Sequence, residues 1–297
     1  MIKPLLILLA AFCVGTVLVA QEGRLESEYK LDVPKDEVTP LWNFLNDNFG
    51  QETFELAGLS LSGQPSTEVF IDKYFDMPDG RFAAGEISLR HRKRFKDRVL
   101  LKQLVQLKTP YSEDKVIRNE IKFEVDKAKS LQDPTRRHDL LQHIKSSDLE
   151  RLSYHLAPLK LRPEALELSL KLMQTRNRIY ISDSNGESIA TITLDEVTLS
   201  RFPFTAYAEM ELELNEVRYT QADTQEREKM TALNEILKSK LIDNFPNLKV
   251  DQRSKYRKMR ELMDGSLAVS LYDNAMWFFF GAITLLAAGF FIKDQLL

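Results

Sequence analysis

The sequence predicts an α+β fold in which helices cover a closed antiparallel β-barrel with a polar interior, with a further hydrophobic helix near each end. The main observation is a set of stretches in which apolar and charged residues alternate with a period of two, which is typical of β-strands. The eight alternating stretches are 24–32, 68–76, 86–95, 99–108, 116–125, 174–182, 188–199 and 206–217. Helical patterns with prolines near their edges occupy about 35–49, 136–156, 163–172 and 221–244. No fixed-period repeat interrupts the body, which we interpret as one domain over residues 24–260.

Several of these stretches carry charges of a single sign on one face. Side chains two positions apart point to the same side of a strand, so a row of arginines forms in one stretch and a row of glutamates in another. The arginines are Arg90, Arg92 and Arg94, and the glutamates are Glu209, Glu211 and Glu213. Any one of these strands alone fits a half-exposed sheet with its charged face in water.

Taken together, the charged rows favour a shared cavity over an exposed face. Like charges side by side on a strand repel one another, so single-sign rows need ligands of opposite charge. Carboxylates hold divalent cations, and arginines hold a strongly anionic ligand directly. A closed barrel places both kinds of row in its interior, turns the apolar faces outward under the helices and leaves no free sheet edge.

Composition excludes several other classes of site. The chain has 297 residues, with 41 Lys+Arg against 44 Asp+Glu, and its net charge of −3 disfavours binding to duplex nucleic acid. Its single cysteine, Cys13, lies before the body, so the body has no thiol nucleophile, cysteine-bound zinc or internal disulfide. The four histidines, His91, His138, His143 and His155, show no metal-ligand spacing. We therefore expect oxygen ligands at any metal site.

Two apolar segments flank the body. Residues 4–20 follow Lys3 and end at Ala20, which predicts over residues 1–20 either a cleaved signal peptide or an uncleaved anchor. Residues 275–292 carry no charge and are long enough to span a bilayer, which needs about 17–25 residues. Lys3 precedes the first segment and Lys293 follows the second, which favours a cytoplasmic location for both outer ends of these segments. We therefore expect a membrane-anchored protein with its body in the periplasm or lumen. The alternative is that these segments are hydrophobic helices of the domain itself.

The charged segments also resemble a known family. Glu26, Glu28 and Lys30 have the ExExK spacing of the CYTH superfamily, the triphosphate tunnel metalloenzymes. Three charged letters recur by chance, but further similar segments follow in the family's order. They are KYFDMPDGRFAAGEISLRHR (73–92), LVQLKTP (104–110), RNE (118–120), RNRIYI (176–181), ITLDEV (192–197), AEMELEL (208–214) and SKY (254–256). Neither apolar end belongs to this pattern.

The resemblance implies an eight-stranded tunnel that binds substrates containing tri- or polyphosphate. It also implies roles for individual residues. The expected ligands of Mg²⁺ or Mn²⁺ are Glu26, Glu28, Asp195, Glu209 and Glu211. The expected phosphate-binding residues are Lys30, Arg90, Arg92, Lys108, Arg118, Arg178 and Lys255, with Glu120 and Glu213 as supporting residues. Which face of their strands carries Arg94, Lys102, Lys122 and Arg176 depends on where the strands end.

Members of the family include inorganic and thiamine triphosphatases, fungal-type RNA triphosphatases, some adenylate cyclases and polyphosphate polymerases. Phosphoryl transfer needs positioning and charge neutralisation more than a covalent nucleophile, which agrees with the residues present. The leading interpretation is metal-dependent triphosphate hydrolysis at a membrane, with Glu209, Glu211 and Lys30 as the catalytic residues. The alternatives are a nucleotidyl cyclase with the same tunnel and a noncatalytic polyphosphate-binding module.

Overall fold

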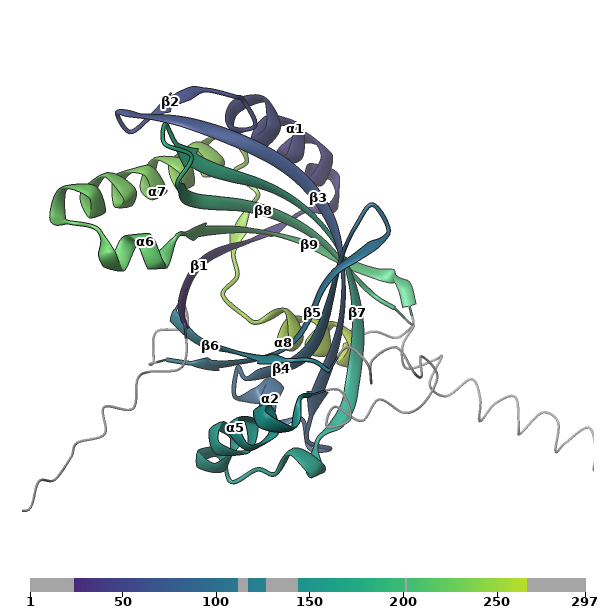
Figure 1. The fold of residues 1–297 in the computed structure, drawn as a ribbon. Coiled ribbons are helices and arrows are strands. Elements are labelled where there is room, and N and C mark those ends of the chain that lie inside the picture. The colour runs from purple at the N-terminus through teal and green to yellow at the C-terminus, as the bar shows by residue number, and fades with distance from the viewer. Residues whose placement is uncertain (1–23, 112–116, 127–143, 201, 266–297) are drawn as a thin grey trace, which may run out of the picture.

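A computed structural model of the chain describes residues 24–111, 117–126, 144–200 and 202–265. It has an α+β fold dominated by one antiparallel sheet (Figure 1). The strands are β1 (Arg24–Val33), β2 (Phe54–Leu56), β3 (Leu59–Asp76), β4 (Ser88–Lys96), β5 (Val99–Pro110), β6 (Ile117–Glu124), β7 (Glu167–Asp183), β8 (Ser188–Leu199), β9 (Phe202–Leu214) and β10 (Lys249–Val250). The α-helices are α1 (Val38–Phe49), α2 (Arg81–Ala84), α5 (Ser146–Leu156), α6 (Glu216–Gln221), α7 (Thr224–Asn244) and α8 (Lys255–Asp264).

The sheet differs from the predicted closed barrel of eight strands. It has ten strands in the order β10-β1-β6-β5-β4-β3-β7-β8-β9, with β2 paired to β3. Strand β1 pairs with β6 only through Arg24–Ser27 and with β9 only through Glu28–Val33, where β10 is its short neighbour on the other side. Pairing is therefore not continuous around the sheet, which stays open beside part of β1. Among the described residues, β10 pairs with only Leu31 and Asp32 of β1.

One predicted helix is a strand. Residues 163–172 were expected to be helical, but only Pro163–Ala165 form a short 3-10 turn, and β7 begins at Glu167. The leucines of this segment recur at every second position, which is the period of a strand. The predicted helices at 35–49 and 221–244 are confirmed as α1 and α7, each with one additional short helical element before it.

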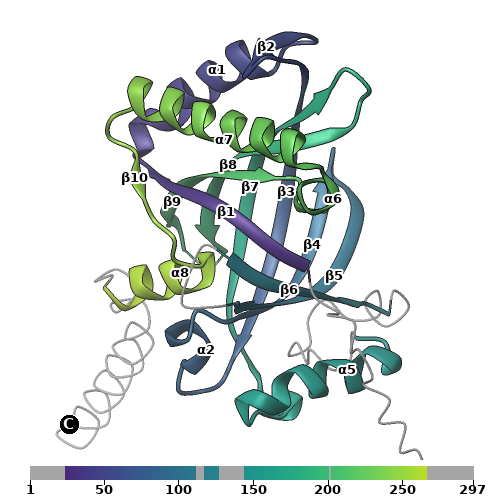
Figure 2. The same ribbon diagram turned by 90° about the vertical axis from the view of Figure 1, so that its left-hand side faces the viewer.

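Helices pack against the outer, apolar face of the sheet. Helix α7 buries Met230, Leu233, Leu237 and Leu241, spaced three or four residues apart, together with Leu41 and Leu45 of α1. These side chains pack on the apolar faces of β7, β8, β9 and β1, and Figure 2 shows helices α1 and α7 lying over this part of the sheet. Helices α2, α5 and α8 belong to a second cluster over β3 to β7. Because the apolar positions face outward, the alternate charged positions of the same strands face the space that the sheet surrounds.

The start of helix α8 lies at one end of that space, where Ser254, Lys255 and Tyr256 line the cavity (Figure 2). Its N-cap residue Ser254 accepts a hydrogen bond from the Arg257 backbone N–H. The Tyr256 ring stacks on Tyr74 of β3 at 5.0 Å between centroids, and its hydroxyl donates to Asp76 at 2.7 Å. These contacts fix the first turn of α8 against the sheet.

The predicted membrane location is corrected by the structure. In the described part of the chain, no helix combines the length and the apolar character that crossing a bilayer requires. The segments 4–20 and 275–292, on which the predicted signal peptide or anchor and transmembrane helix were based, lie outside the described residues.

Candidate functional site

The sheet surrounds a cavity of about 290 Å³ lined mainly by charged side chains. Among its lining residues are the predicted site residues Glu28, Arg90, Arg92, Lys108, Arg118, Arg178, Glu211 and Lys255. Three more predicted residues, Lys30, Asp195 and Glu209, are buried and form ion pairs with these lining residues. Glu26 lies in β1 opposite Arg118, but its side chain is not among those the structure describes. The predicted residues are thus brought together around one space.

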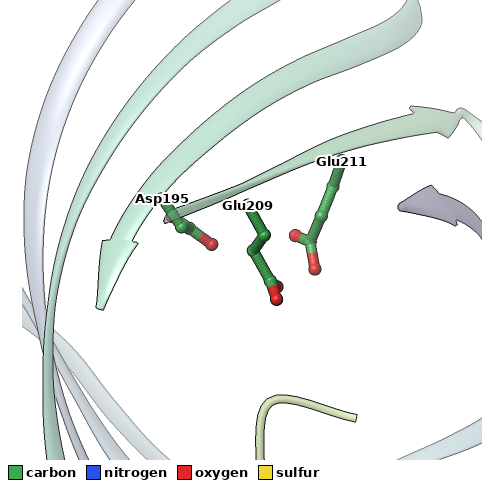
Figure 3. Close-up of side chains that lie close together, drawn as sticks. All are labelled: Asp195, Glu209 and Glu211. Carbon is green, nitrogen blue, oxygen red and sulfur yellow. The ribbon is translucent and has the colours of Figure 1, made fainter. Parts of the chain in front are cut away.

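Three predicted metal ligands form a carboxylate cluster, which we define as Asp195, Glu209 and Glu211. Asp195 of β8 lies opposite Glu209 of β9 in the strand register, and Glu211 is two residues further along β9. Each of the three offers an oxygen within 4.8 Å of the others, and all three side chains are buried. Figure 3 shows them projecting into the same interior space.

Lys255, the first residue of α8, places its ammonium group among these carboxylates. Its Nζ donates to Glu211 Oε1 at 2.7 Å and to Glu209, and it lies 3.0 Å from Asp195 Oδ2. Burial alone would lower the pKa of Lys255, but the three carboxylates raise it above its ordinary value. The carboxylate cluster is therefore already in contact with a cation supplied by the chain itself, and Lys30 and Arg176 add two more.

Burial and neighbouring charges have opposite effects on the acids. Burial would raise the pKa of Glu211, but Lys255, Lys30 and Arg176 hold it well below its ordinary value. Burial would also raise the pKa of Asp195, but Arg176 and Lys255 lower it below its ordinary value. For Glu209, burial together with the adjacent Glu211 outweighs Lys255, and its pKa is raised. The pKa of each acid in the cluster therefore depends on its burial and on the charges of its neighbours.

Glu28 stands apart from the carboxylate cluster. Its carboxylate is held by two lysines, with Lys30 Nζ 2.8 Å from Oε2 and Lys108 Nζ 3.1 Å from Oε1. Lys30 also reaches Glu211 Oε1 at 3.4 Å, so it connects Glu28 to the cluster. Of the five predicted metal ligands, the structure therefore brings three together and leaves Glu28 bound to lysines.

The arginines of β4 lie on the opposite side of the cavity and are held by Asp72 of β3. Arg92 forms a two-pronged interaction with Asp72, with Nε 2.7 Å from Oδ1 and Nη2 2.6 Å from Oδ2. Arg90 Nη1 lies 3.3 Å from Asp72 Oδ2, and Arg90 Nε donates to Gln106 at 2.9 Å. Burial would raise the pKa of Asp72, but Arg92 and Arg90 lower it to about 2. Both guanidinium groups are therefore fixed in place by a fully buried carboxylate.

The remaining predicted cations occupy different parts of the cavity. Arg176 donates through Nε to Asp195 at 2.7 Å and lies 3.3 Å from Glu211, so it belongs to the acidic side. Arg178 lines the cavity and donates to the Tyr180 hydroxyl at 2.9 Å. Arg118 donates to the Gln252 carbonyl at 2.8 Å, in the segment that leads to α8.

Sequence reasoning missed three residues that organise the site. Asp72 was overlooked although it alternates with Tyr74 in the predicted strand 68–76, so the parity rule applied elsewhere would have found it. Glu86 accepts from the Ser254 backbone N–H at 3.0 Å and pairs with Arg257, which anchors the start of α8. Lys258 pairs with Asp32 at 2.5 Å and Asp251 at 3.3 Å. The roles of Glu86 and Lys258 depend on contacts with residues far away in the sequence, so no local pattern indicates them.

This arrangement agrees with the family match of the sequence. Residues 47–243 match the CYTH domain. The chain belongs to the CYTH domain family. The match excludes the ExExK segment and the SKY segment, which the strand pairing and α8 nevertheless place at the same cavity. No curated protein sequence matches this CYTH chain.

Several solved structures resemble this CYTH protein at low sequence identity. A candidate adenylate cyclase from Bacillus halodurans shares 17% identity, with 80% of this chain and 98% of that chain covered and a TM-score of 0.49. HpAC1 from Hippeastrum, which has a dominant triphosphatase activity, shares 18% identity over 80% of this chain and 95% of its own, with a TM-score of 0.48. The RNA triphosphatase Pct1 of S. pombe shares 14% identity over 74% and 84%, with a TM-score of 0.37. Their activities are properties of those proteins.

The carboxylate cluster of this CYTH protein fits a divalent metal ion. All three donors are carboxylates, which suit hard cations such as Mg²⁺ and also Mn²⁺. The Lys255 ammonium group, in contact with all three, shows that the side chains can surround a cation. Asp195, Glu209 and Glu211 are therefore the residues suited to hold the metal.

Proposed function

We propose that this CYTH protein hydrolyses phosphoanhydride bonds of triphosphate-containing substrates with Mg²⁺ or Mn²⁺. The observation that supports this most directly is that carboxylates line one side of the cavity and arginines line the other. Glu211 of the carboxylate cluster lines one side, and Arg90 and Arg92 line the other. Anion binding alone would gain little from three buried carboxylates, whereas phosphoryl transfer requires both metal and cationic groups around the phosphates.

In this proposal the cationic residues bind and orient the substrate. Guanidinium groups bind phosphate oxygens through paired hydrogen bonds, and Arg90 and Arg92 face the cavity together with Lys108. Because Asp72 already fixes both guanidinium groups, they lose little freedom when a phosphate binds. Lys30, between Glu28 and Glu211, brings a further ammonium group to the junction of the two walls.

Asp195, Glu209 and Glu211 would hold the divalent ion. When bound, such an ion neutralises phosphate charge and lowers the pKa of water. Asp195, Glu209 and Glu211 would thereby favour attack by water from the acidic end of the cavity, while the arginines would hold the terminal phosphate. The water oxygen would bond to the terminal phosphorus as the bond from that phosphorus to its bridging oxygen breaks. The products would be inorganic phosphate and the chain shortened by one phosphate, which keeps the bridging oxygen and its electron pair, and a proton of the water would pass to solvent.

The test is phosphate release from tripolyphosphate, ATP and thiamine triphosphate, with Mg²⁺ or Mn²⁺ and with the metal removed by EDTA. We expect metal-dependent release from at least one substrate, and a loss of about 10²-fold or more in Glu211→Gln, as for other electrostatic catalytic groups. The matched control is Glu196→Gln, because Glu196 lies on the exposed face of β8 next to Asp195. Wild-type turnover in Glu211→Gln would contradict the proposal, and tight binding without turnover would favour the noncatalytic binding module.

A further inference from the structure

Three lysines lie on the outer face of the sheet, away from the phosphate-binding cavity. We call them the outer lysine cluster, defined as Lys73 of β3, Lys93 of β4 and Lys171 of β7. Lys73 and Lys93 adjoin Tyr74 and Arg92, which line the cavity, so strand parity turns the two lysines to the opposite face. Lys171 lies directly opposite Lys73 in the strand register and therefore shares that face.

The strand register places these three cationic side chains side by side. Lys73 and Lys171 are directly opposite, which brings their Cβ atoms to about 4.5–5.5 Å from each other. Lys93 is diagonal to Lys73, because it lies opposite Ile71. Among the described residues, none of the three ammonium groups has an ion-pair or hydrogen-bond partner. Like charges at such positions repel one another, and the described part of the chain supplies this cluster with no counter-charge.

Lys73 lies at the centre of the cluster and is partly buried, with the buried His91 directly opposite it on β4. Burial lowers the pKa of Lys73 to about 8, and Lys171 and Lys93 act in the same direction. A group with that pKa is about one-fifth neutral near pH 7.4, which is roughly 10²-fold more neutral amine than an ordinary lysine offers. Neutral amines are nucleophiles, and desolvation beside other cationic groups is one way in which proteins activate a lysine.

We propose that Lys73 is a reversible carbamate site, where its amine captures CO₂ and Lys171 and Lys93 hold the carbamate. The nitrogen donates its lone pair to the carbon of CO₂, one C=O electron pair moves onto oxygen, and an N–H proton passes to solvent. The product is an anion between two cations, which removes the repulsion within the cluster. A neutral acyl group would leave Lys171 and Lys93 without a counter-charge, so the cluster favours CO₂ over neutral acylating agents. This inference does not depend on the proposed function.

The test exposes the full chain to CO₂ and bicarbonate, alkylates any carbamate with triethyloxonium and locates it by peptide mass spectrometry. We expect a carbamate on Lys73, and roughly 2- to 5-fold less of it in Lys171→Met. That change removes a cation that both keeps Lys73 neutral and binds the carbamate. Lys240→Met is the matched control, because Lys240 is exposed on α7, and wild-type levels are expected there. No carbamate on Lys73 in wild type, or an equal amount in Lys171→Met, would overturn the proposal.

A stability measurement separates carbamate formation from general effects of bicarbonate. The lowered pKa of Lys73 belongs to the folded state, and a molecule that binds only the folded state stabilises it. CO₂ at constant pH and ionic strength is therefore expected to raise the thermal unfolding midpoint of wild type. Lys73→Arg keeps the positive charge but stays protonated, so its midpoint is expected not to respond. An equal response in Lys73→Arg would overturn the assignment of the carbamate to Lys73.

Discussion

The two walls of the cavity neutralise their buried charges in different ways. On the acidic wall, Arg176 of the neighbouring strand β7 pairs with Asp195, and the carboxylate cluster of β8 and β9 also receives Lys255 from α8, a helix that follows much later in the chain. On the cationic wall, Arg90 and Arg92 of β4 receive Asp72 from the neighbouring strand β3. Both arrangements leave each buried charge with a partner of opposite sign, as burial requires.

The difference lies in how firmly each counter-charge is held. Asp72 lies directly opposite Arg92 in the strand register, and Arg176 lies directly opposite Asp195, so the sheet itself fixes both of these pairs. Lys255 reaches the acids through a long flexible side chain, while Tyr256 and Arg257 anchor the backbone of α8 through Asp76 and Glu86. We therefore expect that its ammonium group can be displaced while the helix stays in place. In contrast, we expect Asp72 to keep Arg90 and Arg92 in place for the anion. At the metal site, we expect the metal ion to replace the Lys255 ammonium group.

The largest effect on stability is expected from removing the fixed counter-charge, Asp72. Asp72→Ala leaves two buried guanidinium groups without their main partner, and we expect it to lower the free energy of unfolding by about 3–5 kcal/mol. Urea-induced unfolding measures this change. The matched control, Asp79→Ala, removes an exposed pair with Arg81, and we expect a much smaller change because solvent screens that pair. Equal losses in the two variants would show that Asp72 is not the fixed partner we describe.

A smaller effect is expected from pH. The pKa of Asp72 is lowered from its usual 3.8 to about 2 by Arg92 and Arg90, against the effect of burial. A lowered carboxyl pKa stabilises the fold above the unfolded-state value, and this contribution, about 2 kcal/mol, is lost as the pH falls from 4 toward 2. Asp72→Asn cannot titrate there, so its stability difference from wild type should narrow over this range. A difference independent of pH would contradict the lowered pKa.

The strand faces could be predicted from the sequence because side-chain parity is a local property. It identified Arg90 and Arg92 as facing the same space as Glu209 and Glu211, and the structure places all four around it. The same rule explains two errors. Alternating leucines in residues 163–172 already indicated a strand, and Asp72 lay on the inner face of a predicted strand but was not considered.

Other features could not be derived from local pattern. The position of Lys255 depends on how the first turn of α8 packs against the sheet, through contacts of Tyr256 with Tyr74 and Asp76 far away in the sequence. The division of the β1 pairing between β6 and β9 depends on the register of distant strands, which alternation does not predict. The separation of Glu28 from the carboxylate cluster likewise follows from two lysines on different strands.

The most direct test is the affinity of the substrate-free protein for Mn²⁺. The electron paramagnetic resonance signal of free Mn²⁺ measures how much of the ion remains unbound. Lys255→Met removes the ammonium group that occupies the carboxylate cluster, and we expect Mn²⁺ to bind about tenfold more tightly, which corresponds to about 1.4 kcal/mol. Lys255→Arg keeps the charge and is expected to bind like wild type. So is Arg260→Met, which alters only an outer pair of α8 with Asp264. Unchanged or weaker Mn²⁺ binding in Lys255→Met would contradict a replaceable cation at this site.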